Sequence, residues 1–546
     1  MKKVFALVLV LAMVLGCFAA CGNTETEPAA SNTPAADPGT AAPAAPAAPA
    51  QTSTEPLAQG DGSKTGRTDL NIPLASIGNT LNANGATLLV DQYVVNQIYE
   101  PLWYIEDDAS LTPRLAVDRE VNEDGTEIIV TLREGVKFQN GEDFKASDVV
   151  FTFNDCIENF YHTSDISGLK SVEAIDDLHV KFTLEGPNSV FLTTMNCIWI
   201  VSEKAVKEAG DQYGAIPTLA GTGPYIIDYY DQNSKIVLKA NENYWREPAK
   251  IKTITYTPMA DSSTQLLAFQ GGEFDICIIP SADWNNIVSS GMYTTSQAPS
   301  KHVSYIGLNV GHKDNPLYDV RVRQAFHYAI DKAGMCLVAA DGFADPATNF
   351  VRPGLLDGAQ KAGPDFTYNP EKAKELLAEA GYADGCDIGT ISTINGGGGR
   401  YIKIAEYLQQ NLEAVGIKME IEIGETGAIL NDISENHTYD LYVSGNTWNQ
   451  SYYDCYDFYC SKPSSEVIFS ENENIKADWV KDKLNEGLGE MDKEKRDAIY
   501  AEVEAYVSEQ CCYIPIMHIQ NLWAWNPDLN AKAPLNNYLV YEWSWN

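Results

Sequence analysis

The stretch from residue 101 to residue 153 alternates apolar and polar positions in a way that predicts strands joined by tight turns. Ile128, Val130 and Leu132 fall on one face, directly after a turn at residues 122–125 that reads Asn-Glu-Asp-Gly. A spacing of two residues between apolar positions is typical of a strand with one buried face. We therefore predict a strand that follows a reversal of the chain.

A second strand and a helix are predicted directly after the first strand. Val136 and Phe138 alternate with polar residues up to the pair Asn140-Gly141, which is the strongest short signal for a hairpin. Ser147 then stands where the N-cap of a helix is expected. The apolar positions of that helix are Val149, Val150 and Phe153. These segments predict a compact unit of strand, turn, strand, turn and helix.

Later segments carry helix signals at their ends. Asp319 is the expected N-cap of one helix, and Arg321 and Arg323 lie off its apolar face, which places them in solvent or in salt bridges. Asn369 is the expected N-cap of another helix and is followed by a proline in the first turn. Further helices are predicted at residues 88–99, 401–412 and 492–506, and further strands at residues 178–184, 439–444 and 513–517.

Composition places the chain among globular proteins and excludes two kinds of partner. The chain has 546 residues, of which 45% are hydrophobic. This is enough apolar material for about two to four domains with sizeable cores. The formal net charge of −37 argues against binding to nucleic acid and against docking on anionic lipid through a basic face.

The N-terminus predicts export and a lipid anchor. Lys2 and Lys3 precede an apolar run at residues 4–15, which is too short for a comfortable membrane span and has the length of a signal-peptide core. The following residues resemble the lipobox of bacterial lipoproteins, with Cys21 as the expected acylated residue and Cys17 as the rival. A diacylated cysteine would supply two chains, which is enough for stable anchoring. We find no later apolar run long enough to span a membrane.

Cysteine usage does not indicate a metal site or a disulfide framework. The chain has 11 cysteines, and those beyond Cys17 and Cys21 are scattered without CxxC spacing. We expect mostly buried thiols, with Cys455 and Cys460 as the pair to check for a bridge. No metal ligands and no cofactor are predicted.

Several blocks, taken in order, carry a family resemblance. The sequence reads PLWY at residues 101–104, LTPRLA at residues 111–116 and LREGVKFQNGEDFKASDVVFTF at residues 132–153. GTGPY follows at residues 221–225, and the pair Tyr244-Trp245 comes some way after it. No single block is specific, but together they resemble the extracellular solute-binding proteins of family 5, the peptide and nickel type that delivers ligands to ABC importers.

The resemblance implies an α/β fold of the two-lobed, type II periplasmic-binding-protein kind, with mixed sheets flanked by helices and an extra subdomain. The domain organisation that it implies is a signal peptide at residues 1–20, a lipidated cysteine and an Ala/Pro/Thr-rich tether at 21–67, lobe I at 68–282 with the subdomain at about 101–220, lobe II at 283–510, and a return to lobe I at 511–546.

The function implied by the resemblance is capture of a solute between the lobes and delivery to the transmembrane subunits of an ABC permease. We expect a monomer on the outer face of a bacterial cell membrane, held there only by its lipid anchor. Short peptides are the leading ligand class, and nickel, a metal chelate or an oligosaccharide are the alternatives. We expect no enzyme activity, since no HExxH and no GxSxG motif occurs. A secreted hydrolase and a receptor for peptide signals are the alternatives from other classes.

Two candidate ligand contacts are backbone or helix-end features. By resemblance, Ala86, Thr87 and Leu88 form backbone at the mouth of the cleft, although a plain connection is an equal interpretation. Arg400 and Tyr401 follow four glycines and open a predicted helix. Amides at a helix N-terminus with a cation beside them suit a carboxylate or another anion. Simple capping of the helix by a flexible loop is the alternative interpretation.

The last candidate is the polar, tyrosine-rich loop after the strand at residues 439–444. In the family this loop reaches into the cleft, and peptide-binding members place an aspartate three residues after a tryptophan, where it pairs with the ligand's amine. Counted from Trp448 that position is Ser451, and an alternative alignment counted from Gly445 puts Asn449 there, so the charge is missing either way. Tyr452 and Asp454 complete the candidate set, and Asp454 is the nearest carboxylate.

Overall fold

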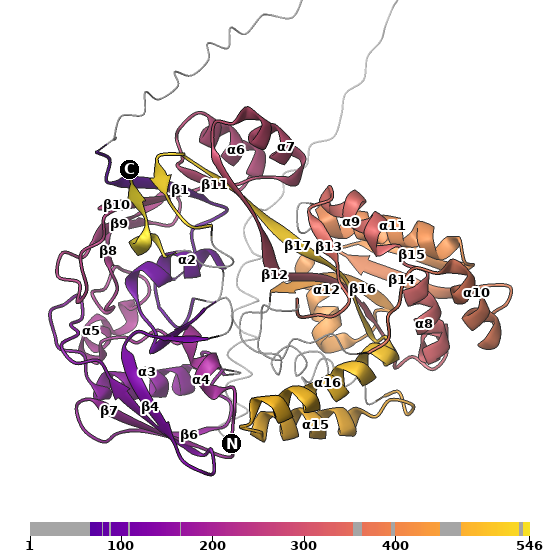
Figure 1. The fold of residues 1–546 in the computed structure, drawn as a ribbon, viewed down its shortest axis with the longest axis horizontal. Coiled ribbons are helices and arrows are strands. Elements are labelled where there is room, and N and C mark those ends of the chain that lie inside the picture. The colour runs from indigo at the N-terminus through magenta and orange to yellow at the C-terminus, as the bar shows by residue number, and fades with distance from the viewer. Residues whose placement is uncertain are drawn as a thin grey trace, which may run out of the picture. The chain divides into compact units, whose positions relative to one another are not determined.

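The fold is a mixed α/β arrangement built from several separate sheets (Figure 1). It is known from a computed structural model that describes residues 66–78, 80–86, 89–106, 110–163, 165–352, 363–394, 399–447, 471–533 and 539–546. Within these ranges no helix is both long and apolar enough to cross a membrane.

One four-stranded sheet contains the first described strand of the chain. Its strand order is β1-β10-β9-β8, and β1 pairs with β10 in parallel while the other neighbours are antiparallel. The strands are β1 (Asp69–Leu74), β8 (Tyr225–Asp231), β9 (Lys235–Ala240) and β10 (Thr253–Pro258). Helix α2 (Leu89–Ile98) shares the apolar core of this sheet.

A second four-stranded sheet lies in the segment that opens the family resemblance. It is antiparallel in the order β4-β5-β7-β6, and α3 packs on β6 and β7. The elements are β4 (Ala116–Val121), β5 (Glu127–Leu132), α3 (Ala146–Asn159), β6 (Leu169–Ala174) and β7 (His179–Leu184). A small hairpin precedes them, formed by β2 (Trp103–Ile105) and β3 (Leu111–Pro113).

The structure confirms the first predicted strand of this unit and corrects two details. Ile128, Val130 and Leu132 are the buried positions of β5. The predicted second strand is absent, because Lys137 and Asp143 form only an isolated bridge around the tight turn. The helix begins two residues earlier than expected, so its N-cap is Lys145, and Ser147 lies inside the first turn.

The largest sheet has seven strands in the order β11-β17-β12-β16-β14-β15, with β13 added on β17. The long strands β12 and β17 are antiparallel neighbours, and β12 also pairs with β16. The strands are β11 (Ile276–Ile278), β12 (Thr294–Leu308), β13 (Ala344–Pro346), β14 (Cys386–Thr393), β15 (Ile417–Ile423), β16 (Leu441–Thr447) and β17 (Tyr513–Trp525).

Helices cover this sheet and bury its apolar side chains in one core. α11 packs on β14, β15 and β16, and α8 packs on α10. The helices are α8 (Val320–Tyr328), α9 (Lys332–Ala340), α10 (Pro370–Glu379), α11 (Arg400–Glu413), α12 (Thr426–Asn431), α15 (Ala477–Gly489) and α16 (Lys493–Gln510). Asp319 and Asn369 cap α8 and α10 through their side chains, as predicted.

The remaining short elements connect these parts. They are α4 (Phe191–Thr194), η1 (Met195–Cys197), α5 (Glu203–Ala209), η2 (Gly210–Gln212), α6 (Ser262–Gln270), α7 (Ser281–Ser290), η3 (Pro316–Tyr318), η5 (Asp432–Asn436), β18 (Leu529–Asn530), η6 (Val540–Glu542) and β19 (Ser544–Trp545).

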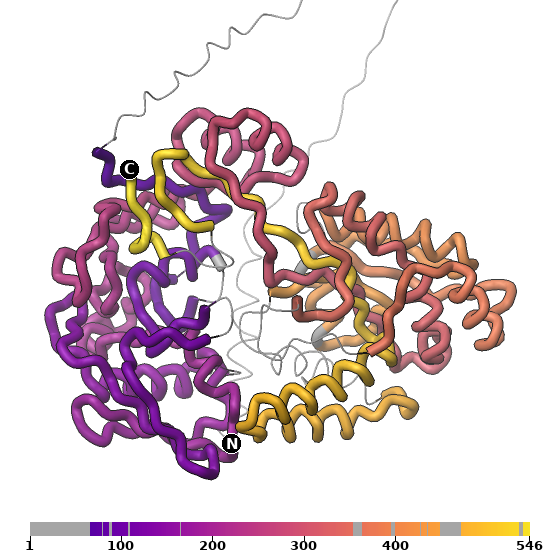
Figure 2. Tube along the Cα trace, viewed as in Figure 1, coloured from indigo at the N-terminus to yellow at the C-terminus, as the bar shows by residue number. Residues whose placement is uncertain are grey.

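The end of the chain returns to its first described residues. The Trp545 indole donates a hydrogen bond of 2.7 Å to the Asp69 carbonyl, and the Arg67 guanidinium lies 4.1 Å from the centre of the Trp545 ring. Figure 2 shows the yellow C-terminal segment beside the indigo start of the described chain. The lobe boundaries given above stay predictions.

The cysteines of the described ranges are thiols, as expected, and most of them are buried. They are Cys156, Cys197, Cys277, Cys336, Cys386, Cys511 and Cys512. Burial raises the pKa of the Cys156 and Cys277 thiols to about 12, which makes both poor nucleophiles. Cys455 and Cys460 lie outside the described residues.

Candidate ligand-binding site

Arg400 is the first residue of α11, the helix that packs against the largest sheet. The helix begins after Gly399, which has a left-handed φ of 81° and supplies no side chain to cap the first turn. Tyr401 is buried together with the other apolar positions of α11, so the helix is fixed to the sheet from its first turn. Arg400 is half-buried beside it, with its guanidinium carbon 5.4 Å from the centre of the Tyr401 ring.

Arg400 contacts a histidine that is not among the predicted site residues. The Nη2 atom of Arg400 lies 3.3 Å from Nε2 of His302 on β12. On the other side of the ring, Nδ1 of His302 lies 3.3 Å from the Thr447 hydroxyl, and these two residues are direct partners in the pairing of β12 with β16. Because a guanidinium only donates hydrogen bonds, Nε2 is the acceptor and Nδ1 carries the proton.

The surroundings of His302 keep its imidazole neutral. Burial lowers the pKa of His302 to about 3, and the positive charge of Arg400 acts in the same direction. The imidazole therefore orients Arg400 without adding a charge of its own. The net charge that this group of residues presents near neutral pH is that of the guanidinium.

Gly445 allows these side chains to meet against β16. A Cβ atom at Gly445 would lie 2.4 Å from the Tyr401 hydroxyl and 2.5 Å from Nε2 of His302. The backbone of β16 is thus in direct contact with both side chains, and any larger residue would have to push them away. The loop was predicted at residues 445–454, but β16 continues to Thr447, so the first three of these residues belong to the strand. The rest of the predicted ligand loop lies outside the described residues.

No carboxylate among the described residues forms an ion pair with Arg400, although the chain is strongly acidic. Its Nε atom is buried and has no hydrogen-bond partner within the same ranges. A fixed cation at a helix N-terminus attracts an anion, because the helix dipole and the exposed amides add to the charge. The arrangement is chemically suited to bind a carboxylate.

Three of the predicted site residues lie within the described part of the chain, and they lie in two different places. Arg400 and Tyr401 lie at the start of α11, whereas Ala86 is buried in the core around β1 and α2. The side chain of Asn84 holds the loop before Ala86. Its Nδ2 donates a hydrogen bond to the Trp199 carbonyl, and its Oδ1 accepts one from the Trp199 backbone N–H. Outside the described residues lie Cys21, Thr87, Leu88, Trp448, Asn449, Ser451, Tyr452 and Asp454.

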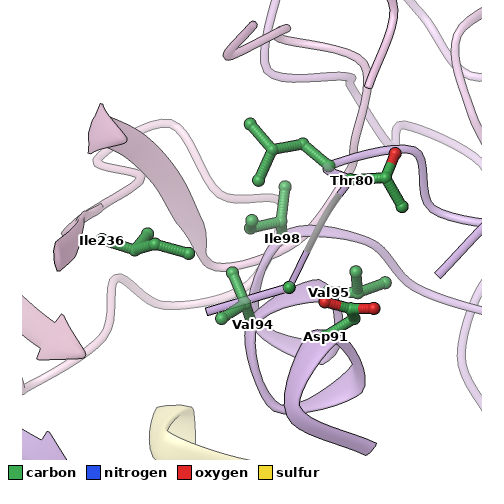
Figure 3. Close-up of a pocket in the computed structure, with 8 residues that line it drawn as sticks. Thr80, Asp91, Val94, Val95, Ile98 and Ile236 are labelled. Carbon is green, nitrogen blue, oxygen red and sulfur yellow. The ribbon is translucent and has the colours of Figure 1, made fainter. Parts of the chain in front are cut away.

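A small pocket in the core around β1 and α2 is too small for a peptide, a chelate or a sugar. It measures about 10 Å³ and lies between Leu81, α2 and Ile236 (Figure 3). Asp91 closes one side, and its carboxylate is so near Gly78 that a Cβ there would lie 1.0 Å from Oδ1. A volume of this size holds about one water molecule. We regard this cavity as part of the fold.

Two blocks of the family resemblance meet at a buried carboxylate. Glu100 accepts hydrogen bonds from the Thr222 hydroxyl at 2.9 Å, the Tyr244 hydroxyl at 2.7 Å and the Trp245 indole at 2.7 Å. Burial raises the pKa of Glu100, and the three hydrogen bonds act against that shift. The GTGPY and Tyr-Trp blocks are therefore structural partners of Glu100.

Comparison with known proteins identifies the family. The model of the bacterial extracellular solute-binding proteins, family 5, matches residues 110–468. The chain belongs to this family. It is 32% identical over 368 residues to the glutathione-binding protein GsiB of Shigella flexneri serotype 5b, an alignment that covers 66% of this chain and 70% of GsiB.

Solved structures of this family show the same fold. The ABC transporter substrate-binding protein CtaP of Listeria monocytogenes superposes with a TM-score of 0.79 and 22% identity, covering 88% of this chain and 99% of CtaP. NikA of Brucella suis in complex with Fe(III)-EDTA gives a TM-score of 0.78 and 21% identity, covering 88% of this chain and 100% of NikA. The family 5 protein described here thus has the predicted type II periplasmic-binding-protein fold. Members of family 5 bind solutes outside the cytoplasm and work with ABC permeases.

Proposed function

We propose that this family 5 protein captures short peptides through a ligand carboxylate that binds Arg400, and delivers them to the transmembrane subunits of an ABC importer. The observation that carries the proposal is the position of Arg400. It is a half-buried cation at the start of α11, held by a neutral His302, and no described carboxylate pairs with it. A ligand carboxylate would supply a counter-ion.

The other predicted contacts support this proposal from the sequence. Trp448 would stack on the ligand, and Tyr452 and Asp454 would complete the polar wall, with Asn449 and Ser451 at the positions where an acidic anchor is missing. Thr87 and Leu88 would offer backbone groups at the cleft mouth. Without an aspartate for the ligand's amine, the carboxylate end becomes the principal anchor.

Relatives support a small ligand with carboxylates. GsiB is named for glutathione, a tripeptide with two carboxylates, and the NikA structure contains a chelate whose ligand also has carboxylates. Short peptides remain the leading class for this chain. A nickel or metal chelate is the second candidate because it would present the same groups to Arg400, and an oligosaccharide is the third.

We further propose that the protein is a lipoprotein that acts without chemical turnover. The signal-peptide core at residues 4–15 and the lipobox-like residues before Cys21 are the support for the anchor. Labelling with a fatty acid in the source organism tests it: a Cys21→Ala variant should lose the label, and a Cys17→Ala variant should keep it. The opposite pattern would move the anchor to Cys17.

A monomer is the expected state of the protein. A secreted hydrolase and a receptor for peptide signals are the alternative functions.

Native mass spectrometry of the protein, purified without denaturation, tests the ligand class. We expect a set of bound masses that sequencing after denaturation identifies as short peptides. An Arg400→Gln variant should retain much less of this material, whereas Arg321→Gln should retain it fully, because Arg321 is an exposed arginine already paired with Asp319. A bound sugar, or peptide retention that Arg400→Gln does not change, would refute the proposed mode of binding.

A further inference from the structure

Three side chains with metal-binding atoms converge near the end of α3, away from Arg400 and its neighbours. His162, Asp165 and Cys197 each offer one ligand atom, and these atoms all lie within 4.8 Å of one another. They come from the loop after α3 and from the last residue of η1, in the region around α3 and α4 in Figure 1. We propose that these residues form a Zn²⁺ site.

The two segments that carry the site are fixed against each other. The Thr194 hydroxyl donates a hydrogen bond of 2.6 Å to the Asp165 carbonyl, and the Cys197 thiol lies 2.9 Å from the Thr194 carbonyl. Nδ1 of His162 lies 3.0 Å from a carboxylate oxygen of Asp165. The three side chains are therefore held near one point by the backbone around them, which lowers the entropy cost of binding an ion.

Two of the three proposed ligands are largely shielded from solvent. The His162 and Asp165 side chains are only 14% and 12% exposed. The second ring nitrogen of His162, Nε2, is buried and has no hydrogen-bond partner among the described residues. A buried imidazole nitrogen that has no hydrogen-bond partner costs free energy, because it has lost its contact with water. A metal ion bound among these groups would provide the stronger interaction.

The set of donor atoms indicates the kind of metal. A thiolate, an imidazole and a carboxylate together match the ligands that Zn²⁺ takes, and the thiolate disfavours Ca²⁺ and Mg²⁺. In a tetrahedral zinc site the donor atoms lie roughly 3.3–3.8 Å apart, given metal bonds of about 2.0–2.3 Å. Side-chain rotations that close the present spacing by about 1 Å are sufficient. Three protein ligands leave the fourth position for water.

Binding would release protons and stabilise this part of the chain. The Cys197 thiol proton, and any proton shared by His162 and Asp165, would pass to the buffer as the ion takes their place. Because the ion would bind only the folded arrangement, it would raise the stability of the protein by mass action. The sequence does not predict this metal site, because the three ligands show no recognised spacing and meet only in the fold.

Cobalt titration of the full-length protein, stripped of metal by a chelator and dialysed, tests the site. We expect one Co²⁺ per chain to produce a thiolate-to-cobalt charge-transfer band, which Zn²⁺ then abolishes by displacement. Cys197→Ser should remove the band and lower zinc affinity by more than the about 10- to 100-fold typical of outer-shell changes. His162→Gln should weaken binding by a similar factor, and zinc should raise the melting temperature of the unaltered protein but not that of Cys197→Ser.

Matched variants separate this site from the other thiols and histidines. Cys386 has the same intermediate exposure as Cys197, and His179 forms the same pairing with an aspartate three residues away but has no thiol in its cluster. Cys386→Ser and His179→Gln should leave the cobalt spectrum unchanged. Absence of the charge-transfer band in the unaltered protein would overturn the proposal, as would an equal band in Cys197→Ser.

Discussion

Arg400 and His302 lie 3.3 Å apart, between Nη2 and Nε2, and the histidine must stay neutral to accept that hydrogen bond. Its pKa falls from 6.5 to about 3 in the fold, chiefly through burial. Between these two values the unfolded chain binds a proton that the folded chain does not. The free energy of unfolding therefore decreases as the pH falls through this window.

We predict that His302→Gln reduces this sensitivity to acid. Urea unfolding at pH 7 and pH 5 should show a loss of stability on acidification that is smaller than in the unaltered protein by on the order of 1 kcal/mol. Equal acid sensitivity of His302→Gln and the unaltered protein would show that His302 titrates normally.

Gly445 provides a second prediction about the same group of side chains. A methyl group there would meet the Tyr401 hydroxyl at 2.4 Å and Nε2 of His302 at 2.5 Å. We expect Gly445→Ala to lower the free energy of unfolding by about 1–3 kcal/mol, because a well-packed site must rearrange. Gly186→Ala is the control, since a Cβ at Gly186 meets nothing within 4 Å. Thermal unfolding of both variants measures the difference, and similar melting temperatures would contradict the prediction.

Glu100 provides a third prediction, on stability alone. Its carboxylate accepts hydrogen bonds from Thr222, Tyr244 and Trp245. In Glu100→Gln the amide NH2, itself a hydrogen-bond donor, would face at least one of these donors. The unmade hydrogen bond should lower the free energy of unfolding by about 1–3 kcal/mol. Urea unfolding measures the loss, and Glu242→Gln, at an exposed carboxylate on the surface, should cost much less. An unchanged stability in Glu100→Gln would mean that the carboxylate is already protonated and donates one of the bonds.

Local sequence signals predicted the elements that depend on neighbouring residues. Asp319 and Asn369 cap their helices because the capping bond is made within a few residues. The strand at Ile128 was equally clear from its alternation. The strand expected at Val136 failed because a strand also needs a partner, and there the chain makes only the bridge of Lys137 with Asp143.

Features that depend on distant segments were missed. Arg323 was expected in solvent or in a salt bridge, but it is 1% exposed and donates to the backbone carbonyls of Leu317, Tyr318 and Gln510. His302 had no local signal, because its role arises only when β12 pairs with β16 and α11 packs beside them. The sequence could have pointed to His302 only through its place in a strand, because the contact with the glycine-preceded start of α11 exists only in the fold.

Isothermal titration calorimetry with tripeptides tests most directly whether Arg400 binds the ligand carboxylate. Peptides with a free C-terminus are compared with the same peptides amidated at the C-terminus, on the unaltered protein and on Arg400→Gln. We predict that amidation and the substitution each weaken binding about 10- to 100-fold, and that their combination is little worse than either alone, because both remove the same charge-assisted bond. Equal affinities for free and amidated peptides, or losses that simply add, would contradict a carboxylate bound by Arg400.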